Sequence, residues 1–261
     1  MKEINIFKMP KKKPIIAVAP IEYFKLHKGH NVEKIKKYIG LAKKAKADIV
    51  CFPESCIKRH GSLVITDKFI KSIREECKHH SIWCIITEDI KTGRKTYNMS
   101  ILIDREGKIK GDYKKINIYG DRTSPGNQVK VFQTDFGKIG IAICWDLTYP
   151  GLFLEMAKKG AEIVFCPAMW NYDLPSHERE HKKREIELLR AMTLARAHEN
   201  IFFVALCNPL MDVKTQVSYS AIASPHRILK ELIDREGLIT AKIDIAEVRK
   251  FRKYYNKHHK P

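Results

Sequence analysis

The sequence lacks any apolar run of about 18 or more residues, the length that a transmembrane helix needs. Its N-terminus, MKEINIFKMPKKKP, has no apolar stretch like that of a secretory signal peptide. It also has no Cys-x-x-Cys pair and an odd number of cysteines, 7, so neither a thiolate zinc site nor a disulfide scaffold is expected. Four cysteines lie in apolar runs, as buried reduced thiols do: Cys51, Cys84, Cys166 and Cys207. We therefore expect a cytoplasmic protein without a membrane segment.

The composition is that of a globular protein, with 44% hydrophobic and 30% charged residues among 261. No low-complexity linker divides the chain, which predicts a single domain over residues 1–261 with a basic C-terminal tail from about 249 to 261. Lysine and arginine outnumber aspartate and glutamate by 49 to 30, so the formal net charge is +19. A partner for this basic surface has to be considered.

Short β-branched runs alternate with helical patterns along most of the chain. Apolar runs of strand length occur at 13–20, 47–53, 81–87, 162–170 and 201–208. Helices are predicted over about 31–46, after Thr66, from Pro150 to Gly160, and over about 175–199. Because hairpins are interspersed with these elements, the pattern favours an α/β fold with mixed rather than purely parallel sheets.

Two hairpins are suggested by turn residues. One spans 97–113 and turns at Glu106-Gly107, and the other contains the DFG turn and a second strand that ends at Cys144. The heptad IDREGKI at 103–109 recurs as IDREGLI at 233–239. The recurrence predicts a similar turn in the second half, unless it is a coincidence between two common turn solutions.

Three chemically reactive side chains follow strand-like runs: Glu54 in IVCFPES, Lys115 in GDYKKINIY and Cys144 in IGIAICWD. A rigid scaffold would hold functional groups in such places. Cys144 closes an apolar strand just before a helix start, where a nucleophile meets backbone N–H groups that stabilise an oxyanion. Taken alone, a cysteine at a strand end also fits a small buried hydrophobic residue.

Several segments together closely resemble the motif blocks of the nitrilase superfamily of carbon-nitrogen hydrolases, in the family's order. The resemblance extends from Ile15 to about Phe251. Its blocks are ADIVCFPE, YNMSILIDREGKIKGDYKK, SPG, GIAICWDLTYP, GAEIVFCPAMW, LARAHENIFFVALCN and YSAIASPHRIL.

The resemblance implies a catalytic triad of Glu54, Lys115 and Cys144. Lys114 is the alternative lysine, but the family's tyrosine-basic-lysine pattern favours Lys115, because Tyr113 fixes the second basic position. The resemblance further implies an α-β-β-α sandwich of two sheets with helices on the outer faces. It also implies a homodimer or a higher homo-oligomer.

This chemistry is reasonable without the family. A thiol with its ordinary pKa of about 8.5 is mostly protonated at neutral pH and needs a base. Glu54 would take the thiol proton, while the Lys115 ammonium and the Trp145 backbone N–H hold the tetrahedral oxyanion. Loss of ammonia would leave a thioester on Cys144, which water hydrolyses, and the reaction needs no cofactor or metal.

The chain departs from the family pattern beside the triad. Members commonly carry a second glutamate where this chain has Tyr119, and Asp121 is the nearest substitute. Many amidases have arginine and then glutamate where this chain has Thr148 and Gly151. The substrate class is therefore less firmly indicated than the reaction type.

Four residues near the predicted strand ends are candidates for the walls of the substrate pocket: Trp145, Trp170, Asn171 and Tyr172. The sequence Cys-Trp-Asp, with Asp146 after Trp145, resembles amidases and carbamoyl hydrolases more than nitrile-cleaving members. We therefore expect a small carboxamide as the substrate. N-carbamoyl amine or amino acid hydrolysis is the first alternative, and nitrile hydrolysis is the second.

Two other classes of function compete with this interpretation. HEREH, from His177 to His181, formally matches a zinc-protease helix, but the charged residues around it disfavour a bound cation. The basic stretches fit a nucleic-acid-binding protein without catalysis, but lysines spread over the predicted helices indicate a solvated surface instead. Neither a metal nor a nucleic acid is expected as a partner.

Overall fold

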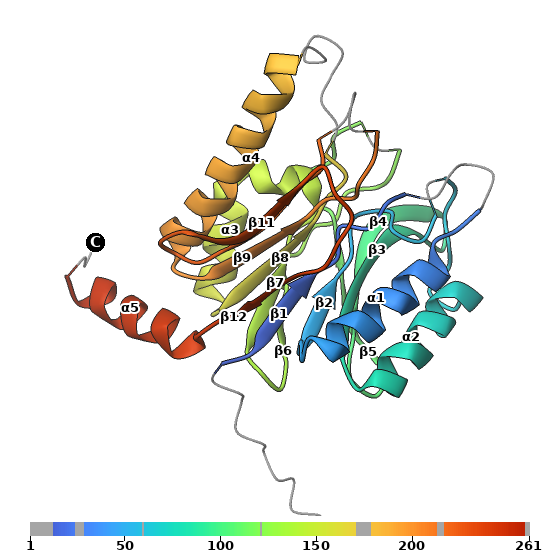
Figure 1. Ribbon diagram of the computed structural model, residues 1–261, viewed down its shortest axis with the longest axis horizontal. Coiled ribbons are helices and arrows are strands. Elements are labelled where there is room, and N and C mark those ends of the chain that lie inside the picture. Colours follow the sequence, from blue (N-terminus) through green and yellow to red (C-terminus); the bar gives the residue numbers. More distant parts are fainter. Residues whose placement is uncertain are drawn as a thin grey trace, which may run out of the picture.

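The computed structural model describes residues 13–23, 29–58, 60–120, 122–170, 179–212 and 217–258. Two six-stranded sheets face each other (Figure 1). The first contains, in spatial order, β12 (Ile239–Lys242), β1 (Ile15–Val18), β2 (Ile49–Cys51), β3 (Trp83–Thr92), β4 (Lys95–Ile103) and β5 (Ile109–Lys114). The second contains β11 (Ile228–Ile233), β10 (Tyr219–Ala223), β9 (Phe203–Cys207), β8 (Ile163–Pro167), β7 (Lys138–Ile141) and β6 (Val131–Gln133).

Both sheets mix parallel and antiparallel pairs. Strands β1, β2 and β3 are parallel to one another, as are β7, β8 and β9, and the outer strands join them in antiparallel pairs. The central strands are buried on both faces, which explains their continuous apolar sequences. The predicted α/β fold with mixed sheets is confirmed.

Helices cover the outer face of each sheet (Figure 1). On the first sheet lie α1 (Val32–Lys44) and α2 (Lys68–His80), and on the second lie α3 (Pro150–Lys158) and α4 (Arg179–Asn200). A separate apolar cluster fills the space between the sheets, with Ile16, Ile85 and Phe165 among its members. Three apolar layers therefore separate four layers of secondary structure, so the α-β-β-α sandwich is confirmed.

Several local predictions agree with the structure, and two need correction. The second helix begins after Asp67 rather than Thr66, because the Asp67 carboxylate accepts the N–H of Phe69 at 2.8 Å and caps the first turn. Strand β7 ends at Ile141, before Cys144, which instead begins the short 3₁₀ helix η2 (Cys144–Thr148).

The two copies of the IDREG sequence adopt different structures. The first forms the β4–β5 turn, where Asp104 Oδ1 accepts the N–H groups of Glu106 and Lys108 at 3.0 and 2.8 Å. The second joins β11 to β12 and so crosses from one sheet to the other. There Asp234 pairs with Lys182 of α4 at 2.8 Å. The second copy does not form a matching hairpin, so of the two interpretations coincidence is the one that holds.

The C-terminal basic segment belongs to a helix, α5 (Ile245–His258), that extends from the sandwich (Figure 1). Arg249 Nε donates to Glu162 Oε1 at 2.6 Å, and Arg252 Nη2 donates to the carbonyl of Ala161 at 2.5 Å. These contacts hold the middle of α5 against the residues just before β8. Within the described part of the chain, no helix is both long and apolar enough to cross a membrane.

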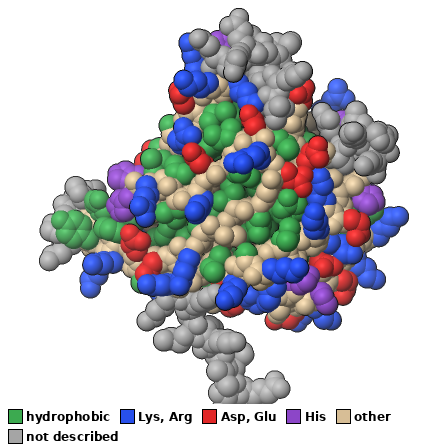
Figure 2. Space-filling view, viewed as in Figure 1, with side chains coloured by type: hydrophobic (Ala, Val, Ile, Leu, Met, Phe, Trp, Pro, Cys, Tyr) green, Lys and Arg blue, Asp and Glu red, His purple; other side chains and the backbone are tan. Residues whose placement is uncertain are grey.

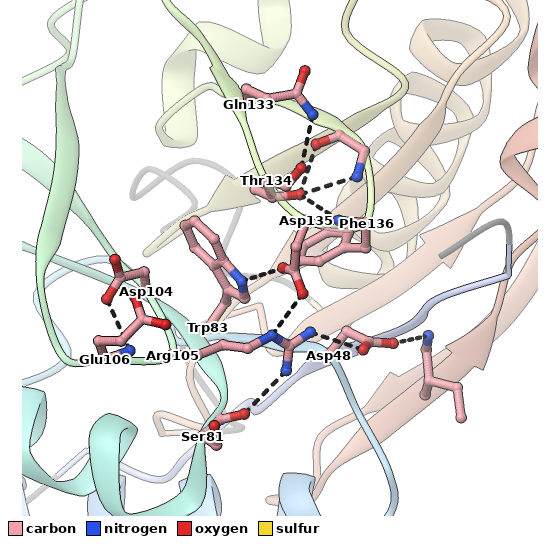
Figure 3. A network of polar contacts seen from close by, with 12 residues as sticks. Asp48, Ser81, Trp83, Asp104, Arg105, Glu106, Gln133, Thr134, Asp135 and Phe136 are labelled. Atoms are coloured by element: carbon pink, nitrogen blue, oxygen red, sulfur yellow. Dashed lines mark hydrogen bonds and ion pairs between the residues drawn. The ribbon is translucent and has the colours of Figure 1, made fainter. Parts of the chain in front are cut away.

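Arg105 ties the two sheets together at the end where β2 and β3 begin (Figure 3). Its guanidinium donates to Asp48 Oδ1 at 2.9 Å, to Asp135 Oδ2 at 2.8 Å and to the carbonyl of Ser81 at 3.0 Å. Asp135, which lies between β6 and β7, also accepts the Trp83 indole N–H at 2.6 Å. One planar side chain thus links both sheets, a geometry that lysine does not reproduce.

We expect Arg105→Met to destabilise the protein, because it retains the aliphatic stem but removes the cation beside the buried Asp48 carboxylate. Loss of one partner of a buried charged hydrogen bond costs about 1–3 kcal/mol, which corresponds to a fall in Tm of about 2–12 °C. Arg94→Met, on the exposed β3–β4 turn, changes the charge equally and serves as the control. Equal Tm values for the two variants would contradict this role of Arg105.

Candidate active site

The three predicted triad residues lie at one edge of the sandwich, where its parallel strands end. Glu54 follows β2 and Cys144 follows β7. Lys115 follows β5, which runs in the direction of β2 because β4 between β3 and β5 is antiparallel to both. The two sheets meet at this edge, since the N–H of Glu54 donates to the carbonyl of Ala168 after β8 at 3.3 Å. Such carboxyl ends are where open α/β sheets place their sites.

Glu54 and Lys115 form a buried ion pair, with Lys115 Nζ 3.1 Å from Glu54 Oε1. Their side chains are only 3% and 2% exposed. Glu54 accepts two further hydrogen bonds, from Asn98 Nδ2 to Oε1 at 2.8 Å and from the N–H of Met169 to Oε2 at 3.0 Å. Both carboxylate oxygens are thus oriented, as a buried charge requires.

Cys144 occupies a sharp turn. Its φ of 48° lies in the left-handed region, which is uncommon for a residue with a side chain, and it opens η2. The first N–H groups of a helix have no intrahelical carbonyl to bind. This geometry places Cys144, a residue of intermediate exposure, at the start of a helix.

Asp146 holds that turn in place from inside the protein. Its Oδ2 accepts the Tyr113 hydroxyl at 2.7 Å and the N–H of Ile143 at 3.0 Å. Its Oδ1 accepts the backbone and side-chain N–H groups of Asn117 at 2.8 and 2.9 Å. Because Tyr113 and Asn117 flank Lys115, this one carboxylate fixes the segment of the lysine relative to the segment of the cysteine.

The surroundings of Cys144 raise the pKa of its thiol well above the ordinary value. Burial is the largest cause, and the negative charge of Glu54 adds to it. The positive charge of Lys115 and the N–H of Met169 lower the pKa in part. In the free protein at neutral pH the thiol is therefore protonated, and a nearby base has to accept its proton before it can act as a nucleophile.

Aromatic rings form a row beside Cys144. Tyr119 stacks on Trp145 with 4.3 Å between ring centroids, and Trp145 lies 5.5 Å from Trp170. The Trp170 indole N–H donates to Glu185 Oε2 of α4 at 3.2 Å. Trp170 is buried and Trp145 is half-buried, so of the two predicted wall residues Trp145 presents more surface to a ligand.

Three other predicted site residues, Asp121, Asn171 and Tyr172, lie outside the described residues. The same holds for His177 of the HEREH sequence, whereas His181 lies in α4. Over the described ranges, no group of three or more His, Cys, Asp or Glu side chains is arranged to hold a metal ion.

Two contacts of Glu54 were not predicted from the sequence. Asn98 belongs to the YNMS part of a family motif block, but the sequence predicted no role for it. Tyr23, whose hydroxyl donates to the backbone carbonyl of Glu54 at 2.5 Å, follows β1 and carries no local signal. Both lie far from Glu54 in sequence, so only the fold shows that they position it.

Known proteins resemble this chain over nearly its whole length. The omega-amidase NIT3 of Saccharomyces cerevisiae is 26% identical over 257 residues, which cover 85% of this chain and 84% of the yeast protein. The crystal structure of yeast Nit3, described as a member of the nitrilase superfamily, has a TM-score of 0.77 at 20% identity and covers 93% of this chain and 94% of its own. A carbon-nitrogen hydrolase from Helicobacter pylori has a TM-score of 0.82 at 20% identity, covering 94% and 93% of the two chains.

The sequence model of a family described as carbon-nitrogen hydrolase matches residues 15–253. That range contains every element from β1 to the greater part of α5, and it includes the Glu54–Lys115 pair and the Cys144 turn. The chain belongs to the carbon-nitrogen hydrolase family, within the nitrilase superfamily.

Proposed function

We propose that the protein is a thiol hydrolase that cleaves the C–N bond of a small carboxamide and releases ammonia. The observation that carries the proposal is the buried Glu54–Lys115 pair, whose charges both act on the Cys144 thiol. A carboxylate, an ammonium and a thiol together supply a base, an oxyanion partner and a nucleophile. The omega-amidase name of a relative fits an amide substrate.

The reaction begins when Cys144 Sγ attacks the amide carbon and Glu54 takes the thiol proton. The carbonyl oxygen becomes an oxyanion, which the Lys115 ammonium and the Trp145 N–H stabilise. Glu54 returns the proton to the amide nitrogen, the C–N bond breaks and ammonia leaves, so that an acyl thioester remains on Cys144. Glu54 then activates water to hydrolyse the thioester, which releases the acid and restores the thiol.

Amide hydrolysis uses this donor arrangement better than nitrile hydrolysis does. An amide places its developing negative charge on oxygen, where Lys115 and the Trp145 N–H act, whereas a nitrile develops charge on nitrogen and needs a proton there. An N-carbamoyl substrate also presents a carbonyl oxygen and remains the first alternative. Asp146 bears on this choice only indirectly, because its four hydrogen bonds go to Tyr113, Ile143 and Asn117.

A nucleic-acid-binding protein without catalysis is the alternative from another class. On the face shown in Figure 2, lysines and arginines are interspersed with acidic side chains and do not form one continuous stripe. Many basic groups also have acidic partners, as Lys34 has in Glu236 and Arg190 in Glu231. This distribution favours a solvated basic surface over a recognition surface.

We further propose that the protein is a homodimer or a higher homo-oligomer. Large apolar side chains remain exposed in α3 and α4 and just before α3: Leu154, Leu188 and Tyr149. A second copy of the chain would cover them. We also propose a cytoplasmic location, because all seven cysteines are free thiols, which suits a reducing compartment.

Cys144→Ala should lower amide hydrolysis by more than about 1,000-fold and leave the fold intact, because the nucleophile is lost. Lys115→Ala should lower kcat by about 100-fold or more, because the oxyanion partner is lost. Lys114→Ala is the matched control, since Lys114 Nζ lies 4.0 Å from the Tyr97 ring centroid and should be dispensable. Ammonia release and circular dichroism measure both effects. Inactive Lys114→Ala with active Lys115→Ala would mean that the lysines have been interchanged.

The mechanism recruits no Lewis acid, so we expect dialysis against a chelator to leave activity unchanged. Stoichiometric zinc in the purified protein, lost together with activity in His181→Ala, would instead favour the zinc-protease alternative. Metal analysis and ammonia release on the same samples decide between the two.

A panel of small carboxamides, N-carbamoyl compounds and aliphatic nitriles should show the carboxamides turning over best. Ammonia release is measured for each compound, with the Cys144→Ala protein as the blank. A kcat/KM for any nitrile about 10-fold above that of the best amide, equivalent to about 1.4 kcal/mol of transition-state stabilisation, would overturn the amide assignment.

A further inference from the structure

Glu88 is a buried carboxyl group that the proposed mechanism does not use. It lies in β3, and its residue surface is 1% exposed. Its Oε1 accepts two backbone N–H groups, from Ile57 and, at 3.1 Å, from Lys58. A buried carboxyl group is costly to retain, so two amides converging on one oxygen indicate a specific task.

The amides that Glu88 binds belong to the turn that follows Glu54. Ser55 adopts a left-handed φ of 52°, which folds the next residues back onto β3. There the N–H of Cys56 donates to the carbonyl of Thr87 at 3.3 Å, next to the Glu88 contacts. The turn belongs to neither a helix nor a strand, so its amides depend on such acceptors.

Tyr23 holds the same segment from the other side. Its hydroxyl donates to the backbone carbonyl of Glu54, one residue before the left-handed turn. The backbone of Glu54 is therefore held at two points. Tyr23 binds its carbonyl, and Glu88 binds the amides of the turn that follows it. A shift in that backbone would move a carboxylate whose position relative to Cys144 determines proton transfer.

We propose that Glu88 is a positioning residue for Glu54, which acts by accepting the Ile57 and Lys58 amides and so fixing the turn that carries the base. The proposal rests on the proposed role of Glu54. Glu88 itself touches neither the Lys115 ammonium nor the Cys144 thiol through any hydrogen bond or ion pair seen among the described residues.

The surroundings of Glu88 raise the pKa of its carboxyl group. Burial, the largest cause, and the neighbouring Asp89 raise the pKa of Glu88 to about 8, while the two amides and the Lys58 ammonium act in the opposite direction. Tyr23 and Cys56 face the same carboxyl group, and the negative charge of its ionised form raises the pKa of both. Near neutral pH, Glu88 is thus mostly protonated in the folded protein.

This raised pKa fixes the sign of a stability effect. The ordinary pKa of the group, which applies when the chain is unfolded, lies below the folded value, so the unfolded chain loses its proton first as the pH rises. Glu88 therefore contributes stability below its unfolded pKa, and the contribution is lost as the pH rises through about 8. Glu88→Gln retains an acceptor oxygen but cannot ionise, so its Tm should fall less than that of the wild-type protein between pH 6 and pH 9.

The test compares Glu88→Leu, Glu88→Asp and Glu88→Gln with a matched control, Glu162→Leu. Glu162 is also buried and accepts the N–H of Lys138 at 2.9 Å, but it lies at the start of β8, at the opposite end of the sandwich. Leucine removes the acceptor oxygen. Aspartate keeps a carboxyl group but shortens the side chain by one methylene group, so the aspartate variant still tests the proposal if the leucine variant does not fold. Two assays are run on each variant. The first measures kcat and KM for the best amide, and the second measures the rate at which iodoacetamide alkylates Cys144.

We expect Glu88→Leu and Glu88→Asp to lower kcat by about 10- to 100-fold with KM within about 3-fold, whereas Glu88→Gln restores most of kcat and Glu162→Leu loses stability alone. Equal kcat values for the leucine variants at 88 and 162, or a glutamine variant as slow as the leucine variant, would overturn the proposal. The alkylation rate should follow the same order, with Glu54→Gln as the slow reference. If the wild-type protein hydrolyses no amide, the proposed function fails, and the alkylation series still decides the role of Glu88.

Discussion

The buried ion pair between Glu54 and Lys115 is the interaction on which the rest of the site depends. Removing two charges from water costs several kcal/mol for each ion unless other hydrogen bonds compensate. Here the compensation comes from Asn98 in β4 and the N–H of Met169 after β8, so both sheets contribute. The pair therefore requires the assembled sandwich, and the sandwich gains a polar connection where its strands end.

Polar contacts connect the sheets at both ends of the apolar layer between them. At the end with the site, the backbone N–H of Tyr23 donates to the carbonyl of Leu210 at 3.0 Å, which links the segments after β1 and β9. At the opposite end, Arg105 binds Asp48 and Asp135 (Figure 3). Apolar packing is not directional and by itself allows facing sheets small shifts relative to each other. Hydrogen bonds at both ends are directional and restrict such shifts. This arrangement holds groups on different sheets at fixed separations.

The candidate site residues that the sequence singled out are those whose signal is local. Glu54 and Cys144 follow apolar strands directly, and the resemblance selected Lys115 over Lys114, whose side chain lies over the Tyr97 ring instead. The strands were also predictable, because their continuous apolar sequences reflect burial, whereas the sandwich was expected from the family resemblance alone. These signals are strong because each depends on a few consecutive residues.

The contacts that position Glu54 carried no such signal. Along the chain, Tyr23, Asn98 and Glu88 lie 31, 44 and 34 residues from Glu54. Folding brings Tyr23 and Asn98 into contact with Glu54, and Glu88 into contact with the turn that follows it. The IDREG sequence illustrates the same limit, because Asp104 closes a hairpin whereas Asp234 pairs with Lys182. A side chain's role depends on the partner that folding brings to it, and a single sequence does not name that partner.

Acidity does not distinguish Cys144 from the other cysteines. Burial raises the pKa of its thiol, as it does for Cys51, Cys56, Cys166 and Cys207. What distinguishes it is its position: Cys144 is the one cysteine of the seven that is not fully buried, and it occupies a left-handed turn. A thiol that stays protonated in the free protein gains nucleophilicity only when the base takes its proton during attack. In the proposed mechanism the reactivity of Cys144 therefore depends on where Glu54 is held, so the turn after Glu54 matters to that chemistry as much as the thiol itself.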